Sequence, residues 1–501
     1  MKMKAPRRQA IAGFFGSAFL VIGAVLYAVF PMIRHIKIME VMKLFNGSFA
    51  YSNWVENPVP VYLNLYLFNV TNPQDILMKG SKPILQELGP YTYEEVRKKI
   101  NIHFNEDEDT VSYRELIKYT FIPDLSNGSL TDVVTTLNLP LTGMAMITEG
   151  KLSLAERMIL PQMIKIFKST PFITRTVYEL TFTGYKDPLM IYLEAQTGKK
   201  ILPNGTFGFF MKNITAKHSI YTGNKYPEKF MQLHSWNNKK SLNWWNTKYC
   251  NMINGTDGSA IKPFLTPEDK PYLFHSDFCR SFHMEFKEEK YIHGVKAYSY
   301  RFPTSVMASP NTEPENQCFC NKSKTCYKSG VFDISVCQPD GVPIVASLPH
   351  FYQGDDTYYN AVIGLNRSEE LHRNILEVEP NLGATILGHK RIQVNMAVRP
   401  VKHIAQYKNF PNLIFPIFWM DENAEWDTEF RKSYYDTFVK PQEMYKILCY
   451  LLMSIGIVIL TFVTYRIVQS LLNKSKQREI VHHLIKNSCS VSAEKCTSCA
   501  I

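Results

Sequence analysis

The sequence lacks the short motifs that mark the common enzyme classes. Its 501 residues contain no Gly-x-Ser-x-Gly elbow, no His-Glu-x-x-His, no Gly-x-x-x-x-Gly-Lys-Ser/Thr loop and no Gly-x-Gly-x-x-Gly fingerprint. Internal repeats, low-complexity stretches and zinc-finger or RNA-binding motifs are also missing. Catalytic groups can converge from distant positions, so these absences lower the expectation of an enzyme without excluding one. We expect a protein that is not an enzyme, uses no cofactor and binds no nucleic acid.

Charge is missing from two long apolar runs, one near each end of the chain. Residues 10–30 and 447–465 contain no Asp, Glu, Lys or Arg. As a helix, either run would span roughly 30 Å, the thickness of a bilayer core. Core helices of soluble proteins are usually shorter and amphipathic, so we predict two transmembrane helices. A cleaved signal peptide is the alternative for the first run, but its length and its end at Phe30 and Pro31 favour an uncleaved anchor.

Basic residues flank both runs on their outer sides. Lys2, Lys4, Arg7 and Arg8 precede the first run, and residues 466–501 also carry an excess of Lys and Arg. The positive-inside rule therefore predicts cytosolic tails at 1–9 and 466–501 and one large non-cytosolic domain at 31–446. These flanks supply most of the net charge of +11. The basic charge thus indicates topology and not nucleic-acid binding.

Asn-x-Ser/Thr triplets support this topology. Eight such triplets lie between the two apolar runs, in the domain predicted to be non-cytosolic. Glycosylation takes place on that side of the membrane. We predict N-glycosylation at Asn46, Asn69, Asn127, Asn204, Asn213, Asn254, Asn321 and Asn366. A further triplet at Asn473 lies in the predicted cytosolic tail and should stay unmodified.

Cysteine usage also fits an oxidising compartment. Six of the ten cysteines fall in the later half of the predicted ectodomain: Cys250, Cys279, Cys318, Cys320, Cys326 and Cys337. An even number there predicts three disulfides, although six cysteines allow 15 pairings and spacing does not choose among them. Structural zinc usually needs Cys-x2–4-Cys pairs, which Cys318-Phe-Cys320 is not, so we expect no metal site.

Strands dominate the expected secondary structure of the ectodomain. Residues 61–68 and 392–398 alternate between two sets of side chains, the pattern of antiparallel strands with unlike faces. Frequent Pro and Gly residues separate short strands, which favours a barrel or sandwich with short helices. No linker divides residues 31–446, so we treat them as one domain.

The segment from Leu152 to Lys168 differs, because its apolar residues are too dense for one strand face. We predict helix, kinked or divided at Pro161. It either packs on the sheet as an ordinary helix or presents an apolar surface with a basic fringe. Lys165 and Lys168 are three residues apart, as are Ile164 and Phe167, which would place each pair on one stripe of a helix. The candidate ligand-binding residues are Arg157, Ile164, Lys165, Phe167 and Lys168.

Several motifs together resemble the class B scavenger receptors. The longest is residues 72–93, with its Asn-Pro-Gln-Asp start and Gly-Pro-Tyr-Thr-Tyr end. The shorter ones are residues 250–257, Cys279-Arg-Ser281, Cys318-Phe-Cys320, residues 347–351, 364–366 and 391–400. The resemblance covers nearly the whole chain, and we expect an insect-type member of a family that includes a fatty-acid translocase, a high-density lipoprotein receptor and a lysosomal integral membrane protein.

The resemblance implies an α+β membrane protein with a hairpin of two transmembrane helices and a β-barrel-like ectodomain. It also implies a helical apex at about residues 150–170 and an apolar tunnel towards the bilayer. Its disulfide pattern would pair Cys250 with Cys318, Cys279 with Cys337 and Cys320 with Cys326. The implied partners are lipids, lipoproteins or other lipid-bearing particles, with a protein ligand at the apex in some members. Oligomeric state and the identity of the lipid stay open.

The C-terminal tail bears on localisation. Glu479 precedes Leu484-Ile485 by one residue more than the usual acidic di-leucine spacing. An amphipathic helix beside the membrane explains Leu484 and Ile485 equally well. We expect the plasma membrane, with the lysosomal or endosomal membrane as the alternative. Cys499 is not fourth from the end and so forms no prenylation box, whereas palmitoylation of Cys489, Cys496 and Cys499 stays open.

Overall fold

The computed structural model describes residues 5–151, 153–198, 200, 202, 205–320 and 326–495. These residues belong to two compact units, one comprising Met1–Lys37 with Arg431–Ile501 and the other Ile38–Phe430. The first unit holds both apolar runs and the second is the ectodomain. Each unit is described by itself.

Two long helices form the first unit. Helix α1 (Ala5–Met42) and helix α11 (Lys440–Lys495) both extend well beyond the apolar runs that predicted them. Each is long and apolar enough to cross a membrane. Helix α10 (Thr428–Tyr434) and the π-helical turn η11 (Tyr435–Val439) lead into α11.

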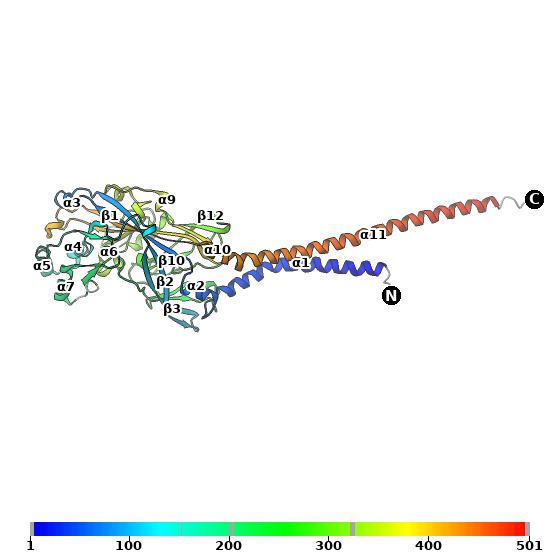
Figure 1. The fold of residues 1–501 in the computed structure, drawn as a ribbon, viewed down its shortest axis with the longest axis horizontal. Coiled ribbons are helices and arrows are strands. Elements are labelled where there is room, and N and C mark those ends of the chain that lie inside the picture. The colour runs from blue at the N-terminus through cyan, green and yellow to red at the C-terminus, as the bar shows by residue number, and fades with distance from the viewer. Residues whose placement is uncertain are drawn as a thin grey trace, which may run out of the picture. The chain divides into compact units, whose positions relative to one another are not determined.

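Glycines bring α1 and α11 close together, and Figure 1 shows the two helices side by side. A Cβ atom on Gly456 would lie 2.7 Å from the carbonyl oxygen of Gly16 and from the amide nitrogen of Leu20. Small residues at a helix crossing allow such contact, the usual way in which membrane helices associate. Tyr445 adds a hydrogen bond from its hydroxyl to the Leu26 carbonyl at 3.2 Å.

An antiparallel sheet of 12 strands forms the framework of the ectodomain. Its strand order is β12-β13-β16-β17-β18-β1-β2-β3-β8-β9, and β15 joins β14 to β17. The strands are β1 (Val61–Val70), β2 (Leu85–Asn105), β3 (Thr110–Phe121), β8 (His218–Tyr221), β9 (Leu233–Trp236), β12 (Glu285–Ile292), β13 (Val295–Arg301), β14 (Val331–Asp333), β15 (Ile344–Ser347), β16 (Ile375–Glu379), β17 (Ala384–Val398) and β18 (Leu413–Glu425). Three two-stranded sheets accompany it: β4 (Val133–Leu137) with β5 (Phe172–Thr176), β6 (Tyr185–Lys186) with β7 (Thr206–Phe207), and β10 (Tyr272–His275) with β11 (Arg280–His283).

The helices of the ectodomain are short, as the sequence predicts. They are α2 (Phe49–Val55), α3 (Pro73–Lys79), α4 (Leu139–Lys151), α5 (Leu154–Ile166), α6 (Val177–Thr181), α7 (Pro188–Thr197), α8 (Asp356–Tyr359) and α9 (Glu369–His372). The 3-10 turns are η1 (Pro123–Leu125), η3 (Pro227–Lys229), η4 (Ser276–Phe278), η5 (Thr304–Met307), η6 (Pro314–Phe319), η7 (Ser335–Cys337), η8 (Pro339–Gly341), η9 (Pro349–Phe351) and η10 (Ala405–Tyr407). Figure 1 shows α3, α4, α5 and α7 gathered at one end of the ectodomain and α2 at the other.

The two predicted strands are present as β1 and β17. In β1, Leu63, Leu65 and Leu67 are buried while the residues between them are partly exposed, so the alternation is that of a strand with unlike faces. In β17 the polar residues Gln393 and Asn395 are also buried. Asn395 satisfies its amide by donating to the Val345 carbonyl at 3.1 Å and to the Ser347 hydroxyl at 3.0 Å.

The described part of the ectodomain has two large apolar cores and a smaller cluster around Phe351. The first joins strands β1, β17 and β18 to the helices α4, α5, α6 and α7. The second joins β8, β9 and β10–β13 to the cysteine-rich segment. Disulfides pair Cys250 with Cys318, Cys279 with Cys337 and Cys320 with Cys326, which are the pairs that the resemblance implies. Cys250–Cys318 ties the segment between β9 and β10 to η6, and Cys279–Cys337 ties the start of β11 to η7.

Candidate ligand-binding surface on helix α5

Local capping sets where helix α5 begins. The Ser153 hydroxyl accepts from the Glu156 amide at 3.3 Å, and the Glu156 carboxylate accepts from the Ser153 amide at 2.7 Å. This reciprocal capping box satisfies two of the free donors at a helix start. Helix α4 ends at Lys151 and α5 begins at Leu154, so Pro161 does not divide the predicted helical segment. Pro161 lies inside α5, where it removes only one backbone hydrogen bond.

One face of α5 belongs to the first apolar core. Leu160 and Ile164 are 3% and 0% exposed. Phe167 is partly buried against the same core and contacts Tyr192, with 5.3 Å between the two ring centroids. Ile164 therefore does not lie on an exposed stripe, and Phe167 is partly buried, because both side chains anchor the helix to the core. The reason is that apolar residues occur all round this helix, so their spacing does not identify the outer face.

The outer face of α5 is apolar as well. Leu154, Met158, Ile159 and Ile166 are 76%, 69%, 52% and 65% exposed. Large apolar side chains at such exposure, close together on one helix, usually mark a contact surface. We call these four residues the α5 apolar face. Sequence reasoning missed them as a group, although their spacing is that of one side of a helix.

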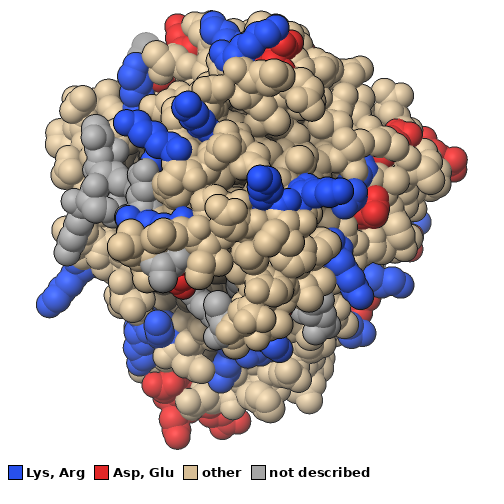
Figure 2. Space-filling model, turned by 90° about the vertical axis from the view of Figure 1, so that its left-hand side faces the viewer, with Lys and Arg blue, Asp and Glu red and all other residues tan. Residues whose placement is uncertain are grey.

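Cations lie beside this face. Lys165 is exposed in the last turn, and Lys168 is exposed just beyond the helix, with a left-handed φ of 49°. The two lysines therefore do not share a helix face as their spacing suggests, because the helix ends at Ile166. Arg157 is half-buried and already has an interaction partner. Figure 2 shows Lys and Arg across the middle of this end of the ectodomain, with Asp and Glu mainly at its margins.

A cluster that the sequence did not reveal joins β2, η9, α9 and β18. Glu87 accepts from His350 Nε2 at 2.6 Å and from the Trp419 indole at 2.7 Å. His350 stacks on His372, with 4.4 Å between the ring centroids. Burial opposes ionisation of Glu87, but donation from His350 and Trp419 holds its pKa below the usual value. Burial, together with repulsion from His350, lowers the pKa of His372 to about 4.

A row of ion pairs crosses strands β2, β3 and β18. Arg97 contacts Glu95, lies 3.4 Å from Glu115 and 3.2 Å from Glu422. Burial and the charge of Glu422 raise the pKa of Glu95 to about 7. Every cation of this row has a carboxylate partner. We therefore interpret the row as a structural element that links the three strands, and not as a ligand site. The described residues include no group of His, Cys, Asp and Glu suited to a metal ion.

The predicted glycosylation sites differ in exposure. Asn46, Asn127, Asn213 and Asn366 are exposed, and Asn254 is half-buried. Asn69 is also half-buried, and its side-chain oxygen accepts from the Thr135 amide at 2.9 Å. Asn204 and Asn321 lie outside the described residues, as do the tail residues Cys496 and Cys499. Modification at each of these positions stays a prediction.

Two long apolar helices and one large β-sheet ectodomain define the class: a membrane-anchored protein with a single extramembrane domain. A family model described as the CD36 family matches residues 14–467. The chain belongs to this family, which confirms the resemblance found in its motifs.

Curated relatives of two kinds are similar to the chain. Lysosome membrane protein 2 of Rattus norvegicus is 36% identical over 392 residues, which cover 77% of this chain and 80% of the relative. The Homo sapiens protein of that name is 35% identical over 77% of this chain and 79% of its own. Scavenger receptor class B member 1 of Bos taurus is 32% identical over 461 residues, 91% of this chain and 89% of the relative. These relatives are mammalian, so the insect-type assignment stays a prediction.

Proposed function

We propose that this protein is a scavenger-type membrane receptor that binds lipids or lipoproteins at the α5 apolar face. In this proposal the lipid then passes through an apolar tunnel in the ectodomain to the membrane. The receptor acts by binding and transfer, without catalysis. The plasma membrane is the proposed location, with both termini in the cytosol.

The exposure of the α5 apolar face carries the proposal. Four large apolar side chains more than half exposed would be costly in water and gain from contact with acyl chains or an apolar particle surface. Lys165 and Lys168 beside them would attract anionic headgroups. A surface that is both apolar and cationic fits an amphiphile with a negatively charged head.

The transfer step follows from the cost of exposing lipid to water. Burial of about 16 CH2 groups is worth on the order of 10 kcal/mol at ~0.8 kcal/mol per group. A chain that left a particle through water would have to overcome most of this energy. An apolar path through the ectodomain keeps the chain desolvated throughout, which is why the proposal includes a tunnel.

A receptor that binds a protein is the second candidate. It follows from the family resemblance, which implies a protein ligand at the apex in some members, and the 36% identity to lysosome membrane protein 2 bears on its location. The same α5 apolar face would then dock a protein, and the location would be the lysosomal or endosomal membrane. Both candidates use the same surface, so binding at α5 alone does not separate them.

Photocrosslinking separates the two candidates. The full-length protein in vesicles would be loaded with a photoreactive fatty acid or sterol, and labelled peptides would be identified by mass spectrometry. The transfer proposal expects label on buried residues of the first core as well as on Met158 and Ile159. Label confined to the outer surface would overturn transfer, and absence of specific label would favour the protein-binding receptor.

A further inference from the structure

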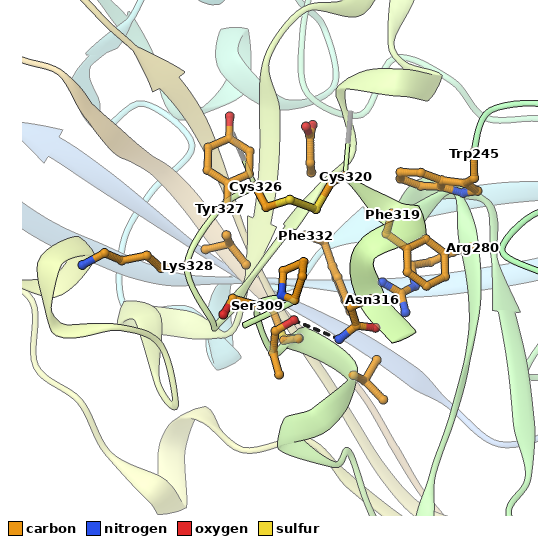
Figure 3. A pocket seen from close by; sticks show the side chains of 16 residues that line it. Trp245, Arg280, Ser309, Asn316, Phe319, Cys320, Cys326, Tyr327, Lys328 and Phe332 are labelled. Atoms are coloured by element: carbon orange, nitrogen blue, oxygen red, sulfur yellow. Dashed lines mark hydrogen bonds between the residues drawn. A yellow bond between two sulfur atoms is a disulfide. The ribbon is translucent and has the colours of Figure 1, made fainter. Parts of the chain in front are cut away.

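A pocket in the cysteine-rich part of the ectodomain lies apart from the α5 surface. Its walls come from η5, η6, β14 and the segments beside the Cys320–Cys326 disulfide, with Trp245 and Arg280 on one side. Figure 3 shows these side chains around the opening. The space not filled by protein atoms is about 530 Å³, part of which is open solvent at the mouth. The enclosed part is therefore small and suits a compact ligand.

Arg280 is the unusual member of this lining. It is 7% exposed on β11, and its guanidinium carbon lies 3.3 Å from the ring centroid of Phe319 and 5.0 Å from that of Phe332. Within the described part of the chain, Arg280 has no carboxylate partner and its buried Nε has no acceptor. Burial without an ion partner lowers its pKa to about 9, so it remains a cation at neutral pH.

Two other cations of the ectodomain are paired. Lys328, also in the lining, lies 3.3 Å from the Asp355 carboxylate and is largely exposed. Arg97 has three carboxylate partners. Since a buried charge is normally paired or hydrogen-bonded, an unpaired guanidinium at the wall of a pocket indicates a missing anion.

The stacking geometry determines how an anion would approach. An aromatic ring on its face stabilises a guanidinium but leaves the in-plane N–H groups free. Figure 3 shows the Arg280 guanidinium below the ring of Phe319 and beside Asn316, facing the pocket. In-plane N–H pairs match a carboxylate, which can accept two parallel hydrogen bonds.

The rest of the lining selects among anions. Trp245, Phe319 and Phe332 present apolar surface next to Arg280. Asp333 also lines the pocket, and together with burial it raises the pKa of Tyr327, which places its negative charge near that ring. The negative charge of Asp333 would repel a dianion such as phosphate or sulfate more than it would repel a monoanion.

We propose that this pocket binds the carboxylate of a small organic monoanion, with Arg280 as the bidentate donor and the aromatic side chains around the apolar part of the ligand. The site lies in the second core and does not depend on the function proposed for the α5 apolar face.

Calorimetry on the full-length protein in detergent tests the site, with benzoate as the probe and acetate, phosphate and sulfate as comparisons. We expect benzoate to bind more tightly than acetate, because of the aromatic lining, and more tightly than either inorganic anion. Arg280→Met should weaken benzoate at least tenfold. Arg280→Lys keeps the charge without the planar fork and should fall between Arg280→Met and the wild type. The matched control is Lys270→Met, which removes a cation that is paired with Glu285 outside the lining and should leave binding within about twofold.

A second variant keeps the proposal testable if Arg280→Met does not fold. Ala308 also lines the pocket, and Ala308→Leu should occupy part of the space and weaken benzoate binding. Benzoate affinity unchanged in both Arg280→Met and Ala308→Leu would overturn the site. Absence of benzoate binding to the wild type at about 10 mM, which would nearly saturate a site with a Kd of about 1 mM, would overturn it as well. Phosphate or sulfate that binds as tightly as benzoate would overturn the preference for an organic monoanion.

Discussion

At the scale of single residues, His372 links stability to pH. It is 3% exposed, and its Nδ1 accepts from the Ser368 amide at 3.1 Å. The groups that face it are His350, Glu87 and Arg391. Since the neutral ring is an acceptor and stacks on a second imidazole, a proton on His372 would break its hydrogen bond and add charge beside His350.

The first prediction concerns acid stability. The folded-state pKa of His372, about 4, lies below the unfolded value of about 6.5. The unfolded chain therefore takes up this proton first, so the contribution is complete above pH 6.5 and is lost as pH falls towards 4. We expect His372 to account for about 2 kcal/mol of lost unfolding free energy between pH 7 and pH 5, measured by denaturant titration.

His372→Asn is the variant for this measurement, because its side-chain oxygen can accept from Ser368 but does not titrate. It should lose less stability than the wild type over the same pH range. Equal losses in the two proteins would show that His372 does not carry this pH dependence.

At the scale of elements, α5 combines an anchoring face with an exposed one. The second prediction separates them. Ile164→Ala should lower the free energy of unfolding by about 2–5 kcal/mol, because it empties a fully buried position. Ile159→Ser should change it by no more than about 0.5 kcal/mol, because this side chain is half exposed.

Ligand binding should show the reverse order. Ile159→Ser, combined with Met158→Ser, should weaken lipoprotein binding, whereas folded Ile164→Ala should retain it. Binding unaffected by the double serine variant would remove the α5 apolar face from the receptor site.

The third prediction concerns the lysines of the same element. Lys165→Glu with Lys168→Glu should leave folding nearly unchanged, because both side chains are exposed. It should weaken binding of anionic lipoprotein, and wild-type binding should fall as salt screens the attraction. Uptake of labelled lipoprotein by cells measures both effects.

Lys239→Glu with Lys248→Glu is the matched control, since it changes the net charge equally at exposed positions in another segment. Normal uptake by the Lys165/Lys168 variant at low salt would exclude these two residues from the site. Equal weakening by both double variants would indicate a general effect of net charge.

At the scale of the whole molecule, the disulfides should differ in how much they contribute to the free energy of unfolding. By the loop-entropy estimate, Cys250–Cys318, with a sequence separation of 68, contributes about 4 kcal/mol. Cys320–Cys326, with a separation of 6, contributes about 2 kcal/mol. The fourth prediction is that Cys250→Ser is retained in the secretory pathway more than Cys326→Ser, measured as surface expression. Equal expression of the two variants would contradict this ranking.

The fifth prediction concerns topology. Tags at both ends should be inaccessible to antibody on intact cells and accessible after permeabilisation, because both flanks are basic. Glycosidase treatment should reduce the apparent mass by several glycans. A mature chain that begins after about residue 30 would show that the first apolar run is a cleaved signal peptide.

Some features could be predicted because they depend on local sequence. The apolar runs become α1 and α11, since the absence of charge over such lengths favours helix in a membrane. The alternation at residues 61–68 becomes β1, since period 2 describes only a strand. The start of α5 is also set by local sequence, because Ser153 and Glu156 form a capping box, a signal that the sequence analysis did not use.

The sequence by itself determined the family, the two long helices, the strand-rich ectodomain and the compartment in which its cysteines are paired, because each depends on composition or on contiguous motifs. Only the tertiary structure decided which side of α5 is exposed, since Ile159 and Ile164 are alike in sequence and differ in what packs against them. It also decided that Arg280 stacks on Phe319 and Phe332, which come from distant segments, and has no ion partner among the described residues. Partners in space depend on how the chain packs, and local sequence does not specify them.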